Sequence, residues 1–163
     1  MQGYGQTIYT TKKGHLKAVT KLNNTPVNAE SHKLYVYLDY KTKQIKGTLD
    51  LRSLISNNAD INNILNTDKP IIVNFSGTIP NNDFMSQPHE ALTFNWLINV
   101  SIQNKNFDML FNATIQHIEE GSTFSCRLSA FSTISVAETG LNELLPDIDK
   151  TIEIQFVQLI LKL

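Results

Sequence analysis

The side chains best suited to chemistry in this 163-residue chain are a single cysteine and four histidines. A cysteine thiolate can act as a nucleophile, and clustered cysteine and histidine side chains can hold zinc. The histidines are scattered, without a His-Glu-x-x-His or paired-cysteine spacing: His15, His32, His89 and His117. We therefore expect no metal site, and each histidine is expected to be an ordinary surface or strand residue. Cys126 lies on an apolar row and is expected to be a small buried hydrophobe.

Other common catalytic motifs are missing from the sequence. Asp147 and Asp149 have the alternating spacing of a calcium loop but lack its glycine and distal glutamate, which favours a solvated loop. There is no G-x-S-x-G turn, no phosphate-binding glycine loop and no dinucleotide fingerprint. Asn74, Asn99 and Asn112 each begin an Asn-x-Ser/Thr triplet, but all lie within expected strands, so we interpret the triplets as chance. The sequence predicts a protein that is not an enzyme.

The elements that would position any site are β-strands, and the clearest is the run from Ala91 to Ile102. Its apolar side chains alternate with mostly polar ones, and a strand places alternate side chains on opposite faces. At about 3.3 Å per residue this strand would be roughly 36 Å long, well above the usual length. A long strand with one apolar face suits the wall of a barrel.

The same period of two recurs along the chain and predicts six further strands. They span residues 32–40, 44–51, 71–79, 107–115, 123–131 and 151–163. Residues 40–43 are expected to join the first two of these as a hairpin, and residues 103–106 to form a tight turn. In the last strand the apolar positions change phase near Val157, which indicates a bulge or a segment covered on both sides.

Two segments break this pattern. Residues 53–67 are rich in asparagine and carry apolar residues at helical spacing in DINNIL, so a short helix is expected there with Asp60 as its N-cap. Residues 80–88 begin and end with proline and are expected to form a loop. With no repeat or linker, residues 1–163 are expected to be one all-β domain. We predict an antiparallel barrel of about eight strands with one short helix after the fourth strand.

Composition excludes several kinds of partner. The 14 Lys and Arg residues nearly balance the 15 Asp and Glu residues, so nucleic acid is not expected to bind. A single cysteine forms no internal disulfide and fits a reducing or an oxidising compartment. No apolar run is long enough for a membrane helix, and MQGYGQTIYTT lacks the features of a signal peptide. The chain is either cytosolic or a mature exported domain, and its sequence leaves both open.

The apolar rows could face a core or, in an outer-membrane barrel, the lipid. Membrane barrels place aromatic residues at the two interfaces, whereas Phe94 and Trp96 lie toward the middle of the longest apolar row. We therefore predict a soluble barrel whose apolar rows point inward.

An eight-stranded barrel can hold one small ligand or be filled by its own side chains. Its inward rows here are apolar and mostly large, so any ligand is expected to be hydrophobic and held by shape and dispersion. The predicted ligand-binding residues are Leu34, Val36, Leu38, Val73, Phe75, Leu92, Phe94, Trp96, Ile98, Met109, Phe111, Phe124, Leu128, Ile154 and Phe156. A barrel filled with side chains, acting as a structural or interaction domain, is at least as common from composition alone.

The order of elements resembles the YceI-like proteins, bacterial lipocalin-like barrels, over most of the chain. YTTKKGHLKAV is similar to the first strands of that family, and SHKLYVYLDYKTKQIKGTLDLRSL to its hairpin. The match is best in DINNILNTDKPIIVNFSGTI, through Pro70, Phe75 and Gly77. Two segments depart from the family: residues 62–65 replace its usual His-Leu pair, and residues 102–105 replace its Gly-Val-Thr type turn.

The resemblance implies a lipocalin-like fold and a carrier function. Members bind polyisoprenoid or ubiquinone-like lipids inside the barrel, need no cofactor for this, and act in the periplasm or after secretion. It also implies that an export signal preceded Met1, although a cytoplasmic location stays open, and dimers occur in the family. An isomerase or cyclase acting on the bound lipid would need a polar inward residue, for which Cys126 is the one candidate.

Overall fold

The computed structural model describes residues 8–80, 90–120 and 123–163, with the backbone alone for residues 119–120 and 123–124. Nine strands account for most of these residues, in the order β1 Ile8–Leu22, β2 Thr25–Asp39, β3 Gln44–Asp50, β4 Ile55–Ser56, β5 Ile72–Thr78, β6 Leu92–Ile102, β7 Lys105–Glu120, β8 Thr123–Ser135 and β9 Thr151–Lys162. The predicted strands are thus present, and β1 and the first half of β2 add to them. Most of the predicted loop at residues 80–88 lies outside the described residues.

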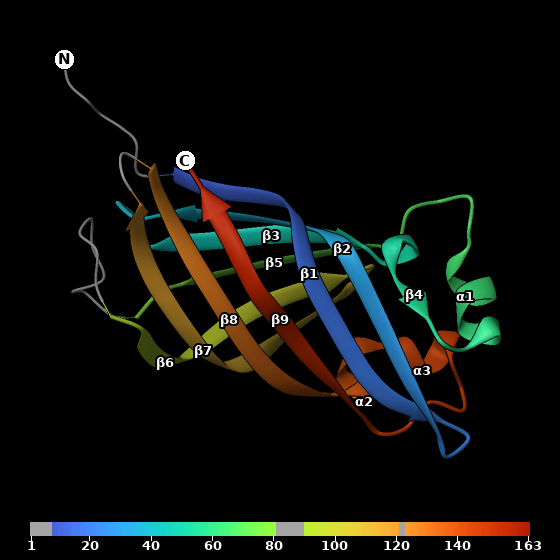
Figure 1. Ribbon diagram of the computed structural model, residues 1–163. Coiled ribbons are helices and arrows are strands. Elements are labelled where there is room, and N and C mark those ends of the chain that lie inside the picture. The colour runs from blue at the N-terminus through green and yellow to red at the C-terminus, as the bar shows by residue number, and fades with distance from the viewer. Residues whose placement is uncertain (1–7, 81–89, 121–122) are drawn as a thin grey trace.

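Eight of these strands close into an antiparallel barrel (Figure 1). The ring runs β1-β2-β3-β5-β6-β7-β8-β9, and β9 pairs again with β1. The two-residue β4 lies outside the ring and pairs with the first part of β2. The predicted all-β, lipocalin-like barrel of about eight strands is confirmed. Closure leaves no open sheet edge in the ring.

The helices gather at one end of the barrel, which we call the helical end (Figure 1). They are the 3-10 helix η1 at Leu51–Ser53 and three α-helices, α1 at Ala59–Leu65, α2 at Val136–Thr139 and α3 at Leu141–Leu144. The helix predicted after the fourth strand is α1. None of the helices in the described ranges is long and apolar enough to cross a membrane.

The N-cap of α1 differs from the predicted one. The side chain of Asn58 accepts a hydrogen bond from the backbone N–H of Ile61 at 3.1 Å, so the helix begins two residues before the expected position. Asp60 instead lies in the first turn, where its negative charge still favours the helix N-terminus. Helices α2 and α3 were not predicted.

The turn and bulge expected from the pattern are both present. Strands β6 and β7 pair along their length from Leu92↔Ile115 to Ile102↔Lys105, and the tight turn between them has φ 53° at Gln103. In β9 the pairing with β8 shifts between Leu128↔Leu159 and Ala130↔Phe156. Gln158 lies in this shift with φ 44°, which identifies the phase change as a bulge.

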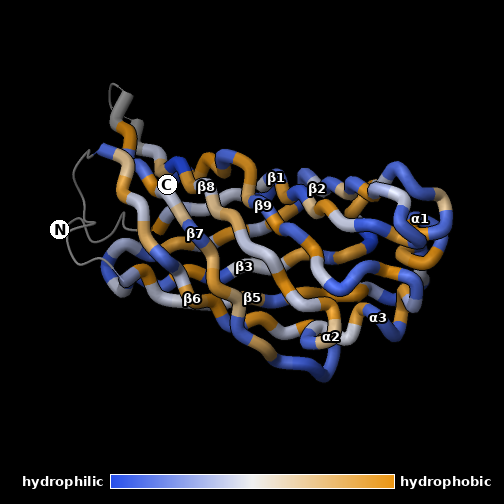
Figure 2. The backbone as a smooth tube through the Cα atoms, turned by 90° about the horizontal axis from the view of Figure 1, so that it is seen from below, coloured by the Kyte–Doolittle hydropathy of each residue, from blue (hydrophilic) through white to orange (hydrophobic). Residues whose placement is uncertain are grey.

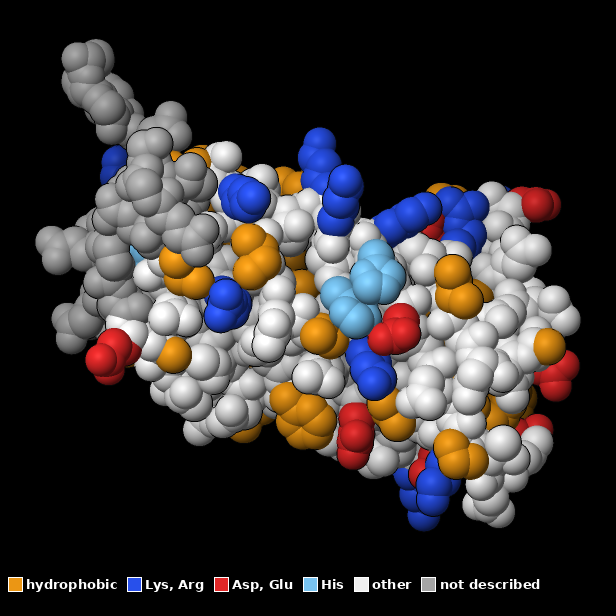
Figure 3. Space-filling view, in the orientation of Figure 1, with side chains coloured by type: hydrophobic (Ala, Val, Ile, Leu, Met, Phe, Trp, Pro, Cys, Tyr) orange, Lys and Arg blue, Asp and Glu red, His pale blue; other side chains and the backbone are white. Residues whose placement is uncertain are grey.

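The apolar rows point into the barrel and the polar rows point out. Along most strands hydrophobic and hydrophilic residues alternate (Figure 2). Leu34, Val36 and Leu38 on β2 are at most 1% exposed, while the intervening tyrosines are half-buried on the outside. The outer surface carries scattered charged groups and a pair of histidines over β1 and β2 (Figure 3). These are His15 and His32, whose rings stack with centroids 4.2 Å apart.

Candidate functional site

A cavity of about 160 Å³ lies inside the barrel in the half nearest the helical end. Strands β1, β2, β3, β5, β6, β7, β8 and β9 all contribute to its wall. Thr20 is the one polar residue among the described residues that line it; all the others are aliphatic, aromatic or methionine. No charged side chain lines this space, so it offers a ligand dispersion contacts and exclusion from water.

The helical end covers this cavity. Leu54, Ile61 and Leu65 reach it from the segment between β3 and β5, and Leu141 and Leu145 from the segment between β8 and β9. Ile61 and Leu65 are four residues apart and therefore lie on one face of α1. Leu54 and Leu141 are half-buried, whereas Ile61 and Leu65 are buried. Leu54 and Leu141 are thus the cover residues in this group that are partly open to solvent.

A second group of contacts ties the helical end to the barrel. The Asn62 side chain accepts from the Ser56 backbone N–H at 2.8 Å and donates to the Ser56 carbonyl at 3.0 Å, which joins α1 to β4. Arg52 donates to both carboxylate oxygens of Asp50. This hydrogen bond from Arg52 lowers the pKa of Asp50. Polar contacts on the outside therefore hold an apolar cover in place.

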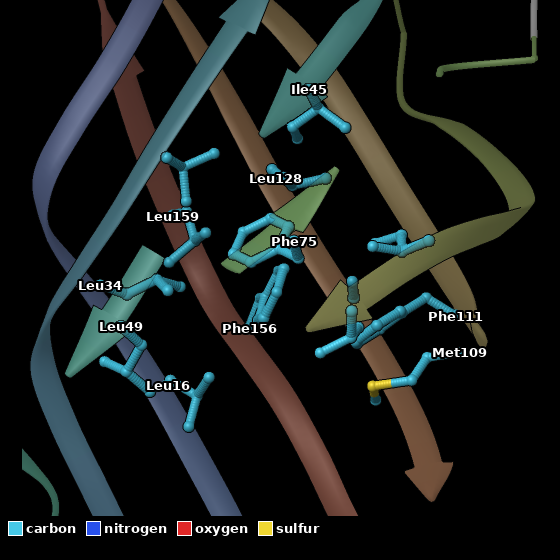
Figure 4. Packing of buried hydrophobic residues seen from close by; sticks show 14 of the residues in the cluster. Leu16, Leu34, Ile45, Leu49, Phe75, Met109, Phe111, Leu128, Phe156 and Leu159 are labelled. Carbon is cyan, nitrogen blue, oxygen red and sulfur yellow. The ribbon is translucent and has the colours of Figure 1, made fainter. Parts of the chain in front are cut away.

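Three phenylalanine rings form the floor of the cavity, and we call them the aromatic floor: Phe75 from β5, Phe111 from β7 and Phe156 from β9. The ring centroids of Phe75 and Phe156 are 5.6 Å apart, and those of Phe111 and Phe156 are 5.1 Å apart. In Figure 4, Phe75 and Phe156 lie between Leu16 and Leu49 on one side and Ile45 and Leu128 on the other. The first pair lines the cavity and the second does not.

The position of Phe75 depends on Gly47, its partner on β3. A Cβ on Gly47 would lie 2.3 Å from Cζ of Phe75 and 2.4 Å from the Tyr35 carbonyl oxygen, distances that real Cβ atoms essentially never have. Gly47 therefore allows the Phe75 ring to lie directly against the barrel wall.

Eight of the fifteen residues predicted to bind a ligand line the cavity: Leu34, Val73, Phe75, Ile98, Met109, Phe111, Ile154 and Phe156. Six point into the barrel or lie at its edge but outside the cavity: Val36, Leu38, Leu92, Phe94, Trp96 and Leu128. The side chain of Phe124 lies outside the described residues. The six belong to the same inward rows but to the half beyond the aromatic floor, which side chains fill.

Trp96 shows how that half is filled. Its side chain is 0% exposed, and its ring centroid lies 6.2 Å from that of Phe111 and 6.4 Å from that of Phe94. Across the part of the chain that the structure describes, the indole N–H has no hydrogen-bond acceptor. Trp96 thus supports the aromatic floor from behind.

A buried polar cluster at the end opposite the helices was not predicted. Tyr9, Tyr40 and His117 are each 3% exposed, and Cys126 is 0% exposed. The Tyr9 hydroxyl and His117 Nε2 are hydrogen-bonded at 3.1 Å, and the ring centroids of Tyr40 and His117 are 5.2 Å apart. The rings of Tyr9 and Tyr40 are 4.6 Å apart. The hydrogen bond between Tyr9 and His117 therefore satisfies one pair of polar groups inside this end of the barrel.

This cluster bears on the idea of catalysis through Cys126. Burial raises the pKa of the Cys126 thiol to about 12, so it is protonated at neutral pH and is a poor nucleophile. Cys126 also lies outside the cavity. The isomerase or cyclase hypothesis therefore gains no support from the geometry.

The sequence carried a signal for this cluster. The inward rows include Leu38, Ile115 and Cys126, and one further step of two residues places Tyr40 and His117 inside as well. His117 is thus a core residue rather than an ordinary strand residue. Several cavity residues that were not predicted come from β1 and the start of β2, where the alternation is weaker: Leu16, Ala18, Thr20, Val27 and Ala29.

Comparison with known proteins finds a solved structure of similar fold. No family model matches the sequence, and no curated protein is detectably similar to it. Among solved structures, a polyisoprenoid-binding domain from Saccharophagus degradans is similar, with a TM-score of 0.65 and 10% sequence identity over 95% of this chain and 96% of that chain. The resemblance found in the sequence is therefore confirmed as a likeness of fold, and the neighbour that shares the fold is a binding domain.

Proposed function

We propose that this protein is a non-enzymatic carrier that holds the apolar chain of an isoprenoid lipid inside the barrel. The observation that carries the proposal is the cavity at the helical end, whose wall is apolar apart from Thr20. The fold of a polyisoprenoid-binding domain supports it. The neighbour's ligand class agrees with the chemistry of the wall, because an isoprenoid chain is a branched hydrocarbon without charge.

The volume limits how much of the lipid fits. An apolar protein cavity of about 150 Å³ stays dry and holds one benzene molecule. The cavity of about 160 Å³ therefore takes the end of an isoprenoid chain without rearrangement. A longer chain, such as a ubiquinone-like tail, would leave through the helical end, with its polar head group outside the barrel.

The proposal extends to the biological setting. We place the protein in the periplasm or outside the cell, where an apolar chain must be shielded from water during transport or storage. The ligand is its one expected partner class; neither nucleic acid nor a required cofactor is part of the proposal, and a homodimer stays a prediction.

The experiment compares two tryptophan reporters. Geranylgeraniol and farnesol are titrated into the native protein and into a Trp96→Phe, Phe107→Trp variant, while tryptophan emission is recorded. Phe107 lines the cavity and is half-buried, whereas Trp96 lies behind the aromatic floor. We expect a saturable blue shift at position 107 and a much smaller change at Trp96. Lipid extracted from purified protein and identified by mass spectrometry provides an independent readout.

The titration separates the alternatives. If neither reporter responds up to the solubility limit of both probes and no lipid is extracted, the structural or interaction domain is favoured. That alternative now describes only part of the barrel, because side chains fill the half beyond the aromatic floor and leave the other half hollow.

A further inference from the structure

A second concave site lies on the outside of the barrel and is separate from the cavity. It is a groove of about 570 Å³ across the outer face of β2, β3, β5 and β6, which we call the outer groove. Its volume falls within the range of about 300–1,000 Å³ that is typical of small-molecule sites. The proposed lipid-binding function does not involve this outer surface.

Two cross-strand rows of outward side chains build the outer groove. In one row Tyr37 pairs with Lys46, Lys46 with Ser76, and Ser76 with Asn99. Each pair joins neighbouring strands, so the row crosses four strands at about 4.8 Å per step. It is therefore about 14 Å long, which is longer than one sugar ring.

The second row runs beside the first, two residues further along each strand. Tyr35 pairs with Thr48, Thr48 with Asn74, and Asn74 with Ser101. Both rows therefore begin at a tyrosine on β2. The first continues through Lys46 to two short polar side chains, and the second continues over short polar side chains alone. The large rings at one side and the short side chains beyond them give the surface its concave form.

The short side chains offer hydrogen bonds that the protein does not use. Within the described residues, Thr48, Asn74, Ser76 and Ser101 make no side-chain hydrogen bond to another protein group. Asn99 donates from Nδ2 to Asp108 Oδ1 at 3.2 Å, which fixes its amide and leaves its carbonyl oxygen as an acceptor. The floor thus presents both donors and acceptors without a net charge.

Tyr35 adds an aromatic platform, whereas one face of the Tyr37 ring is already covered by Lys46. The Lys46 ammonium lies 5.2 Å from the centroid of the Tyr37 ring and is the one charged group lining the described part of the groove. The face of an aromatic ring carries negative potential, which attracts the C–H groups on the flat face of a pyranose as it attracts a cation. Tyr35 is half-buried and lies in the same cross-strand row as Asn74, with Thr48 between them.

We infer that the outer groove binds a neutral oligosaccharide. An aromatic platform beside uncharged amides and hydroxyls matches a chain of sugar rings, whose faces are apolar and whose edges are hydroxyl groups. Nucleic acid would require several cations, and only Lys46 is present in the described groove. A protein partner would favour a broad apolar centre, whereas most side chains that line this groove beside Gly47 and Phe75 are polar.

The test uses affinity electrophoresis of the whole protein in native gels that contain one soluble polysaccharide each. The panel is hydroxyethylcellulose, glucomannan, xylan, dextran and the anionic control polygalacturonate. We expect at least one neutral glycan to retard the protein. Tyr35→Ala and Ser76→Arg should each weaken that retardation about tenfold or more, the first by removing the platform and the second by filling the floor.

The matched control is Asn112→Ala, an exposed outward asparagine on β7 that does not line the groove. It should be retarded like the native protein. Thermal melts accompany each variant, and Ser76→Arg keeps the test valid if Tyr35→Ala does not fold, because Ser76 is exposed.

Lack of retardation by every neutral glycan overturns the inference, as does retardation that survives both groove variants. Retardation by polygalacturonate alone also overturns it, because that result would indicate an anion site at Lys46. Phe75 lines both the cavity and the groove, but Tyr35 and Ser76 do not line the cavity, so the comparison of these variants does not depend on lipid binding.

Discussion

The two halves of the barrel are built from the same inward rows but have opposite interiors. Toward the helical end, Ile98, Val100 and Ile102 on β6 line a cavity. On the same row and strand, Trp96 lies in a half that side chains fill. A period of two shows which side chains point inside, but it does not show which of them face a void.

The difference follows from how each end is closed. At the filled end, large side chains and the hydrogen-bonded cluster around Tyr9 and His117 occupy the interior itself. At the helical end, the cover is made by segments outside the ring, whose residues such as Ile61 and Leu145 line the end of the cavity. A barrel can therefore be hollow wherever its closure comes from outside the ring.

The largest expected effect comes from emptying the filled half. Trp96→Ala should cost about 3–5 kcal/mol of unfolding free energy, because the indole is fully buried and closely packed. Met109→Ala on the cavity wall should cost about 2 kcal/mol, since fewer atoms contact its side chain. Urea unfolding measures both values. Equal losses would contradict the distinction between the two halves.

Alkaline pH should destabilise the filled half. Burial raises the pKa of Cys126 from 9.0 to about 12 and also raises that of Tyr40. The unfolded chain therefore loses these protons first, and the folded state binds more protons between about pH 9 and 12. The contribution of these protons to the free energy of unfolding is complete below about pH 9 and is lost as the pH rises through this window. The slope is at most about 1.4 kcal/mol per pH unit for each proton.

Urea midpoints at a series of pH values measure this slope. Cys126→Ser removes the contribution of the thiol and should flatten the slope, while a variant in the hollow half, such as Met109→Leu, should keep it. An unchanged slope in Cys126→Ser would show that the thiol does not contribute.

Two alanines provide a direct test of free space. Ala113 is 0% exposed in the filled half, and Ala29 is 7% exposed on the cavity wall. Ala113→Leu should destabilise the protein by about 1–3 kcal/mol through overpacking. Ala29→Leu should leave stability within about 1 kcal/mol and weaken geranylgeraniol binding, because the new side chain enters the cavity. Thermal melts and the reporter titration measure these effects, and similar destabilisation in both variants would argue against a cavity.

The smallest expected effect is on the cover itself. Asn58→Ala removes the N-cap of α1 and should cost about 1 kcal/mol or less, because the barrel stays intact. It should speed the release of a bound chain more than it lowers stability. Stopped-flow displacement of geranylgeraniol measures the release rate; an unchanged rate would indicate that the chain does not pass α1.

Much of the barrel could be predicted from the sequence, since alternation depends only on whether a side chain points in or out. The alternation predicted the bounds of β6 almost to the residue, and it indicated the bulge near Gln158. The cavity could be predicted only in part. Trp96 and Ile98 have the same burial and alternate in the same way, yet only Ile98 lines the cavity, because the distinction depends on partners from distant strands.

Two other features needed the structure for different reasons. Helices α2 and α3 have four residues each, too few for a periodic pattern to show. The outer groove depends on register between strands, since Tyr35 and Asn74 are brought together by pairing through β3. The spacing of residues along the chain does not show that Tyr35 and Asn74 belong to the same groove.

Under the proposed function, the aromatic floor would set the length of hydrocarbon that the barrel accepts. A lipid chain that entered from the helical end would stop where Phe75, Phe111 and Phe156 meet, so the size of these side chains would limit how far it reaches. Replacing one ring by a smaller residue would lengthen the bore toward Trp96 without altering the strands. Because Gly47 leaves room for the Phe75 ring, the absence of a side chain at this position of β3 would contribute to the choice between shorter and longer ligands.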